Sequence, residues 1–223
     1  MNRRQFLKKG LEGIIIGSIL FISCSKYPTK SEIKELNIVD FTMEQNITYL
    51  LTSENNVYEM SSSDEATLIK INNRKTYYKL KLKEFLTDNI GVNRYVILCK
   101  GDSMCYGIIS PGLTDSTISY SSRFVRINPY TGDEEFLNYI EGYPAGLFIS
   151  GDKMWYISNR ITLSSILRSY DKYSGKMLEK IITPIYDARG LSIDEDGNFT
   201  TYEKSSNSFI KFKIENNEFK LEN

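Results

Sequence analysis

The stretch Tyr143–Gly175, YPAGLFISGDKMWYISNRITLSSILRSYDKYSG, contains in 33 residues the pattern that the rest of the chain repeats. Its first apolar run, Gly146–Ile149, is separated by the turn pair Gly151-Asp152 from a second β-prone run, Met154–Ile157. After a polar loop comes a third such run, Ile166–Asp171, which ends in a Ser-Gly turn. Short apolar runs bounded by turn residues predict a strand, a hairpin turn, a second strand, a loop and a third strand.

Parts of this pattern recur at nearly constant spacing. The run Gly146–Ile149 matches Gly190–Ile193, which lies 44 residues later. The strand and turn Arg126–Gly132 match Ser169–Gly175 at an offset of 43 residues. The hairpin pair Gly101-Asp102 precedes its counterpart in the quoted stretch by 50 residues. Internal self-similarity at a fixed period indicates a repeat architecture.

Two further copies complete the count at four. Phe212–Asn217 fits the end of a last copy, and a degraded first copy runs from Val39 to Asn72. A period near 45 residues with about four strands per copy is typical of a β-propeller blade. The motif Gly-Leu-x-Ile, turn, aromatic strand, Tyr-Asp-x-x-Ser/Thr-Gly resembles the repeats of NHL, SMP-30 and quinoprotein-like propellers. We therefore expect an all-β fold, a small β-propeller-like domain of about four to five blades; a generic antiparallel β-protein is the alternative.

The stretch before the second copy leaves the blade count open. Arg74–Asn93 is long enough to donate strands to a fifth blade, which would resemble the glutamine cyclotransferase propeller. Lys79–Lys83 alternates Lys and Leu with period two and predicts a strand, whereas Lys83–Asp88 predicts at most a brief helical turn. Ile33–Phe41 is a candidate closing strand that pairs with the C-terminal blade and removes open edges.

The first residues predict export. Asn2–Lys9, NRRQFLKK, resembles the twin-arginine signal, from which Asn2 departs at the first position. The apolar run Gly13–Ser23 is too short to cross a bilayer, which needs about 20 residues, and has the length of a signal-peptide core. The general secretory route remains an alternative, because paired arginines occur in both kinds of leader.

The end of this run resembles a bacterial lipobox. Leu20–Cys24, LFISC, matches it except for Phe21, where Leu or Val is usual. The resemblance implies cleavage before Cys24 and lipidation of its thiol with a diacylglycerol, palmitate being a typical acyl chain. We expect a signal peptide over 1–23, a lipidated tether over 24–32 and the β-domain over 33–223. An ordinary signal peptide with an incidental cysteine is the alternative reading.

Export and lipidation together predict the location. The protein would be anchored to the cell membrane or the outer membrane and would face the periplasm or the exterior. Removing the leader takes away four basic residues and one acidic residue, so the mature chain would carry a net charge of −3. A mildly acidic domain has no electrostatic reason to lie flat on anionic lipid, so the lipid on Cys24 would be the membrane contact.

Composition narrows the classes of function. The 223 residues carry no net charge, which argues against a nucleic-acid partner. The chain has no histidine, the commonest general base and metal ligand. We therefore predict no catalytic residue, no metal site and no cofactor, and expect binding rather than catalysis.

A few residues invite a chemical role beside a structural one. Cys99 and Cys105 share parity and would face the same side of a hairpin, yet their counterparts Ile149 and Trp155 indicate buried thiols. An exported protein permits a disulfide between them. Asp194–Asn198 looks like the start of a calcium loop but lacks the downstream glutamate, which favours a hairpin turn. Aromatic and apolar positions of the quoted stretch predict packing between blades: Phe148, Met154, Trp155 and Tyr156.

A binding mouth follows from the fold alone, because propellers bind ligands where loops converge at the channel. The loops that enter the innermost strands give Arg94, Tyr143, Asp187 and Arg189 as ligand-binding candidates. An Asp beside an Arg is also the pattern of an ion pair that holds loops together. The polar insertion 110–122 is a second candidate loop.

The function that we predict from the sequence is a binding or scaffold module for a protein or small ligand in the cell envelope. The enzyme alternative is a hydrolytic propeller of cyclotransferase or lactonase type, which predicts clustered carboxylates at one channel mouth. A third reading is an assembly factor that uses its surface loops. Fold alone does not decide among them.

Overall fold

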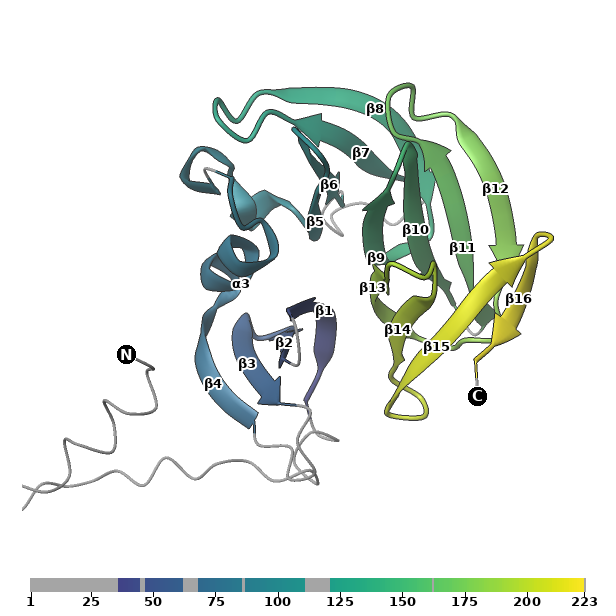
Figure 1. Cartoon of the computed structure of the whole chain (residues 1–223). Coiled ribbons are helices and arrows are strands. Elements are labelled where there is room, and N and C mark those ends of the chain that lie inside the picture. Colours follow the sequence, from purple (N-terminus) through teal and green to yellow (C-terminus); the bar gives the residue numbers. More distant parts are fainter. Residues whose placement is uncertain are drawn as a thin grey trace, which may run out of the picture.

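The computed structural model describes residues 36–44, 47–61, 68–85, 87–110, 121–161 and 163–222. These residues form an all-β, four-bladed β-propeller of four-stranded antiparallel sheets (Figure 1). The predicted leader, Cys24, the tether and most of the insertion 110–122 lie outside the described residues. No described helix is long and apolar enough to span a membrane.

Each blade is one continuous stretch of chain, and its first strand lies nearest the axis of the ring (Figure 1). The strands are β1 (Ile38–Glu44), β2 (Ile47–Thr52), β3 (Asn56–Ser61) and β4 (Leu68–Asn73) in blade 1; β5 (Ile97–Lys100), β6 (Cys105–Ile109), β7 (Ser121–Ile127) and β8 (Glu134–Glu141) in blade 2; β9 (Tyr143–Ser150), β10 (Lys153–Arg160), β11 (Leu163–Asp171) and β12 (Met177–Ile182) in blade 3; and β13 (Ala188–Ile193), β14 (Phe199–Glu203), β15 (Ser208–Glu215) and β16 (Glu218–Leu221) in blade 4.

The sequence repeat corresponds to equivalent turns between the third and fourth strands. After β7, Asn128 Oδ1 accepts hydrogen bonds from the backbone N–H groups two and three residues on, and Asp171 does the same after β11. Each turn then reaches a glycine with positive φ, Gly132 at 77° and Gly175 at 67°, a conformation that a side chain disfavours. The predicted four-copy repeat is confirmed.

Glycines also let the inner strands approach each other. A Cβ on Gly146 in β9 would lie 2.4 Å from the carbonyl carbon of Gly190 in β13. Gly190 itself has a φ of +68°, and a Cβ there would lie 2.4 Å from the Phe41 ring in β1. The shared glycine of the Gly-Leu-x-Ile motif is therefore required where blades 1, 3 and 4 meet at the axis.

Four core clusters lie at the four junctions between neighbouring blades. Trp155 of blade 3 meets Phe199 of blade 4 edge to face, with ring centroids 4.9 Å apart. Phe124 of blade 2 meets Tyr170 of blade 3 at 6.0 Å. Met154 and Tyr156 are buried in the cluster between blades 2 and 3. The predicted role of these aromatic residues in packing between blades is confirmed.

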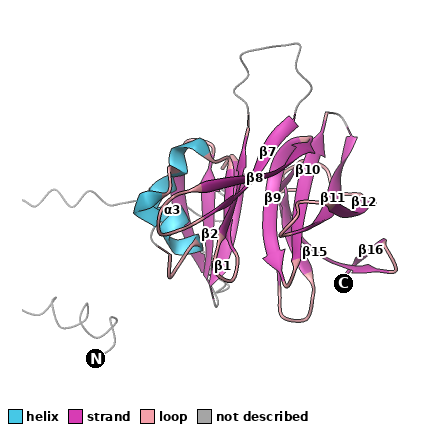
Figure 2. Ribbon diagram, turned by 90° about the horizontal axis from the view of Figure 1, so that it is seen from above, coloured by secondary structure: helices cyan, strands magenta, loops and turns pink. Residues whose placement is uncertain are grey.

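The junction between blades 1 and 2 differs from the others, because short helices fill it. They are α3 (Arg74–Lys81), η1 (Thr87–Asn89) and η2 (Val92–Arg94). Figure 2 shows α3 on the side of the domain away from β12 and β16. The predictions of a fifth blade from Arg74–Asn93 and of a strand over Lys79–Lys83 are wrong.

The helix forms for reasons that a five-residue alternation does not reveal. Asn73 caps it, because its side-chain oxygen accepts hydrogen bonds from the backbone N–H groups of Lys75 and Thr76. Tyr78 and Leu82, four residues apart, are both fully buried on one face. The alternating Lys and Leu residues are therefore compatible with a helix that buries Leu82 as well as with a strand. The helix ends at Lys81, before the helical turn that was predicted over 83–88.

Within the part of the chain that the structure describes, the ring closes without strand exchange. β1 pairs with β2 and packs against β13 through Phe41 and Gly190, while blade 4 consists of C-terminal strands alone. For the described part of Ile33–Phe41, the prediction of pairing with the C-terminal blade is wrong, because Ile38–Phe41 belong to β1, the inner strand of blade 1. Residues 33–35 lie outside the described residues.

Candidate functional site

A cavity of about 370 Å³ lies on the propeller axis, where the four inner strands end. Its volume falls within the range of small-molecule sites, about 300–1,000 Å³. Residues of β1, β5, β9 and β13 contribute to the wall, and the end of α3 closes the space between blades 1 and 2. The lining residues are Phe41, Thr42, Met43, Glu44, Tyr49, Leu80, Lys81, Lys83, Cys99, Lys100, Gly101, Asp102, Phe148, Ile149, Gly151, Leu191 and Ser192.

The wall combines apolar side chains with a charged rim. Phe41 and Leu191 are buried, whereas Phe148 and Ile149 are only half-buried in the described chain. A half-buried aromatic ring at a channel end is available for contact with a bound molecule. Glu44 and Lys83 on the rim form an ion pair at 2.5 Å.

A buried ion pair supports the helical side of the cavity. Lys81 Nζ of α3 lies 2.5 Å from Asp40 Oδ2 of β1, with 7% and 1% of the two side chains exposed. The Lys81 ammonium also lies 5.6 Å from the centre of the Tyr77 ring. Burial raises the pKa of Tyr77 well above its usual value, and the Asp40 carboxylate raises it further. Tyr77 is therefore a neutral phenol beside a compensated pair of charges.

A second lysine joins blades 2 and 3 at the same end of the channel. Lys172 is buried, and its Nζ lies 2.9 Å from Asp102 Oδ2 and 2.8 Å from the Gly151 carbonyl oxygen. Asp152 lies 3.4 Å from the same nitrogen. The hydrogen bond to Asp102 is the main reason why the pKa of Lys172 is raised. This lysine fixes the hairpins that border the cavity.

The two cysteines of the domain are unpaired buried thiols. The register pairs Cys99 with Tyr106 and Lys100 with Cys105, so the two thiols lie on opposite faces of blade 2. The prediction that they share a face is wrong, because the turn Gly101–Met104 has four residues. Burial raises the pKa of Cys105 to about 12 and raises that of Cys99 as well. Both are protonated at neutral pH, and Cys99 lines the cavity.

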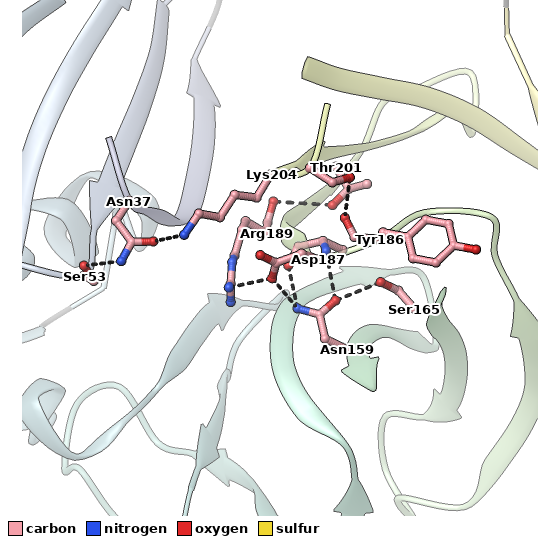
Figure 3. Close-up of polar contacts among 11 residues, drawn as sticks. Asn37, Ser53, Asn159, Ser165, Tyr186, Asp187, Arg189, Thr201 and Lys204 are labelled. Carbon is pink, nitrogen blue, oxygen red and sulfur yellow. Dashed lines mark hydrogen bonds and ion pairs between the residues drawn. The ribbon is translucent and has the colours of Figure 1, made fainter. Parts of the chain in front are cut away.

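Three of the four predicted binding residues, Tyr143, Asp187 and Arg189, lie at the other end of the inner strands. Tyr143 begins β9, and Asp187 and Arg189 flank the start of β13. Asp187 Oδ1 and Arg189 Nη2 form an ion pair at 2.6 Å (Figure 3), which is the structural alternative that the sequence offered. Arg94 is separate from them: it pairs with Glu134 at 3.1 Å. Their assignment to ligand binding stays a prediction.

The sequence analysis missed Asn159, which joins blades 3 and 4 beside this ion pair (Figure 3). Its amide Nδ2 donates to the Ala188 carbonyl oxygen at 3.0 Å, and its Oδ1 accepts from the Ala188 N–H at 2.9 Å. Ser165 Oγ donates to the same Oδ1 at 2.8 Å. The side chain thus replaces a strand partner for Ala188. Nothing in the spacing of the sequence marks this contact, which joins residues 29 positions apart.

The acidic stretch Asp194–Asn198 is a hairpin turn, as predicted. Asp194 Oδ2 accepts a hydrogen bond from Asn198 Nδ2 at 2.8 Å, and Gly197 has a φ of +78°. This side-chain hydrogen bond is the main reason why the pKa of Asp194 falls to about 2. Across the described ranges, no three His, Cys, Asp or Glu side chains gather in a group that could hold a metal ion.

Comparisons with known proteins assign no family to this chain. No protein-family model matches the chain, and no curated protein matches it. Two computationally designed proteins, Ika8 and Ika4, are each 11% identical with a TM-score of 0.40; the alignments cover 82% and 80% of this chain and 48% and 91% of theirs. BamB from Moraxella catarrhalis is 9% identical with a TM-score of 0.37, over 78% of this chain and 43% of its own length. The chain therefore spans about half of two of these proteins, and no family or activity follows from such distant matches.

Proposed function

We propose that this chain is an exported binding module of the cell envelope, held at a membrane by lipid on Cys24. The cavity at the end of the four inner strands carries this proposal. It is the place where four separate blades contribute to one concave surface, and its walls include half-buried aromatic and aliphatic side chains. Concave, largely apolar surfaces with a few polar groups are typical of binding sites.

The leader supports the cellular part of the proposal. The Arg-Arg-Gln-Phe-Leu-Lys run, the short apolar core and the Leu20–Cys24 motif occur in the order expected of an exported lipoprotein. Replacing Cys24 by Ala is expected to release the protein from the membrane fraction. Unchanged fractionation of the Cys24→Ala protein would remove the anchor from the proposal and leave the binding domain.

The binding role is tested by crosslinking of the tagged, full-length protein in cells, followed by detergent purification and mass spectrometry. One stoichiometric envelope partner is expected for a scaffold, and a bound small molecule is expected for a ligand carrier. Two substitutions locate the contact. Phe148→Ala alters the cavity wall, whereas Arg189→Ala alters the predicted mouth at the other end of the strands.

The outcome assigns the site to one end of the channel. Loss of the partner or ligand with Phe148→Ala alone supports the cavity. Loss with Arg189→Ala alone moves the site to the mouth predicted from Arg94, Tyr143, Asp187 and Arg189. Recovery of neither a partner nor a ligand from wild-type protein would contradict the proposed role.

A further inference from the structure

Every charged side chain that lines the cavity already has an oppositely charged partner within the described chain. Lys81 pairs with Asp40 and Lys83 with Glu44, each at 2.5 Å. Asp102 pairs with Lys172 at 2.9 Å. Lys100 has the loosest contact, with its Nζ 3.7 Å from a carboxylate oxygen of Glu84.

This complete pairing constrains what the cavity can bind. A charged ligand would lose water on entering and would have to compete with an existing pair for its counter-ion. The competition is hardest at Lys81, because that ammonium and its Asp40 carboxylate are almost completely buried. An uncharged ligand meets neither penalty and still gains apolar contact with the walls.

The apolar part of the lining gives the ligand its second property. Phe41, Phe148, Ile149 and Leu191 of β1, β9 and β13 all line the cavity. Most of the apolar surface open to a ligand comes from the half-buried Phe148 and Ile149, because Phe41 and Leu191 are each only 1% exposed. Removing apolar surface from water is favourable by about 25 cal/mol per Å², so these walls favour a molecule with a compact apolar body. We infer that the cavity binds a small, uncharged, mainly apolar molecule and discriminates against ions of either sign. This inference rests on the proposed binding function and adds the class of ligand.

The test uses three probes of one shape and different charge: naphthamide, naphthoate and naphthamidine. Full-length protein is placed in lipid nanodiscs, and calorimetry against empty nanodiscs measures binding. Phe148→Ala reports whether the probe occupies this cavity, because Phe148 lines it and naphthamide bound there should weaken clearly in that variant. Naphthamide is expected to bind at least about tenfold more tightly than either charged probe.

Freeing one lysine should reduce the preference for naphthamide over naphthoate. Asp40→Asn leaves Lys81 without its carboxylate and is expected to raise naphthoate affinity by about tenfold, provided that the variant folds. Glu44→Gln frees the more exposed Lys83 and is expected to raise the naphthoate affinity by at least about threefold, while the buried Asp40–Lys81 pair stays intact. Glu215→Gln is the matched control, since it frees the exposed Lys220 in the outer hairpin of blade 4, away from both ends of the channel, and should leave all three affinities unchanged.

Each outcome decides the inference. Tighter binding of naphthamide that weakens in Phe148→Ala, together with a gain in naphthoate affinity in Glu44→Gln, supports it. Equal or tighter binding of a charged probe by wild-type protein, naphthamide binding that is unchanged in Phe148→Ala, or no probe binding at all overturns it. If a crosslinked partner is found while no probe binds, the ligand class fails and the binding module stands.

Discussion

The junction of blades 3 and 4 and the junction of blades 1 and 2 solve the same packing problem in different ways. Between blades 3 and 4, Gly146 lets the inner strand β9 contact the backbone of β13 at Gly190, and the Asn159 amide joins blade 3 to the start of β13. Between blades 1 and 2, α3 fills the space, and the buried Asp40–Lys81 pair fixes the helix to the inner strand. Near the axis, the first junction depends on the absence of a side chain, with Trp155 and Phe199 packing across the same junction, whereas the second junction is filled by a helix and its large side chains.

This difference matters because the cavity borders both kinds of junction. Direct strand contact between β9 and β13 forms one part of its wall, and the end of α3 forms another. A change that enlarges a glycine should therefore disturb the first junction alone. A change that uncouples α3 should disturb the second.

The largest effect is expected for Gly146→Ala. The new Cβ would lie 2.4 Å and 2.6 Å from the carbonyl carbon and oxygen of Gly190, and a backbone cannot rotate away as a side chain can. We expect a loss of about 4 kcal/mol in the free energy of unfolding, measured by urea denaturation. Gly151→Ala is the control, because open space surrounds its Cβ position and only its φ of +56° adds strain, about 1 kcal/mol. Equal losses in the two variants would contradict the close approach.

Removal of Lys81 tests the other junction. Lys81→Met keeps the apolar stem but leaves Asp40 as a buried carboxylate without its ammonium. Breaking such a pair costs about 3 kcal/mol or more, so the urea midpoint should fall clearly. Lys83→Met, two residues away, removes an exposed lysine from Glu44 and should change the midpoint little. A midpoint for Lys81→Met as high as that of Lys83→Met would mean that the pair does not hold α3 in place.

The sequence predicts the first junction far better than the second. The motif Gly-Leu-x-Ile occurs at 146 and at 190, so the sequence marks its glycine as a required position. The structure supplies the reason, which is that neither glycine has room for a Cβ atom. The helix α3 occurs once, outside the repeat. Its alternating Lys and Leu residues match a strand pattern over five residues. The helix is stabilised by the cap at Asn73 and by the ion pair with Asp40, a residue that is distant in the sequence.

The sequence also predicts only those features of the candidate site that belong to the repeat. The repeat predicts that inner strands converge on an axis, and therefore that a channel has two ends. The repeat does not predict which end of the channel holds the cavity, because Leu80 and Lys81 in the cavity wall come from the helix that the sequence analysis missed. The predicted mouth used the loops that enter the inner strands, where Asp187 and Arg189 are engaged with each other.

A smaller effect is expected at the Asn159 bridge. Asn159→Ala removes the acceptor of the buried Ala188 N–H, and an unsatisfied buried donor costs about 1–3 kcal/mol. Hydrogen exchange at Ala188 should accelerate more than exchange within β11, because the contact is local to the junction. Asn37→Ala is the control: its amide is exposed and bonds to Ser53 and Lys204, so the expected change is within about 0.5 kcal/mol.

The smallest effect is expected away from both junctions, in the hairpin tip at Asp194. The pKa of this carboxyl is lowered to about 2, chiefly by the hydrogen bond from Asn198, so its stabilising contribution is complete above the unfolded value near 3.8 and is lost as the pH falls through about 2. The stability difference between wild type and Asp194→Asn, followed by urea unfolding, should therefore shrink as the pH is lowered from about 4 to 2. Glu195→Gln in the same turn is the control, and its difference from wild type should show no such convergence. If Asp194→Asn instead behaves like Glu195→Gln, the hydrogen bond between Asp194 and Asn198 contributes nothing to the free energy of unfolding.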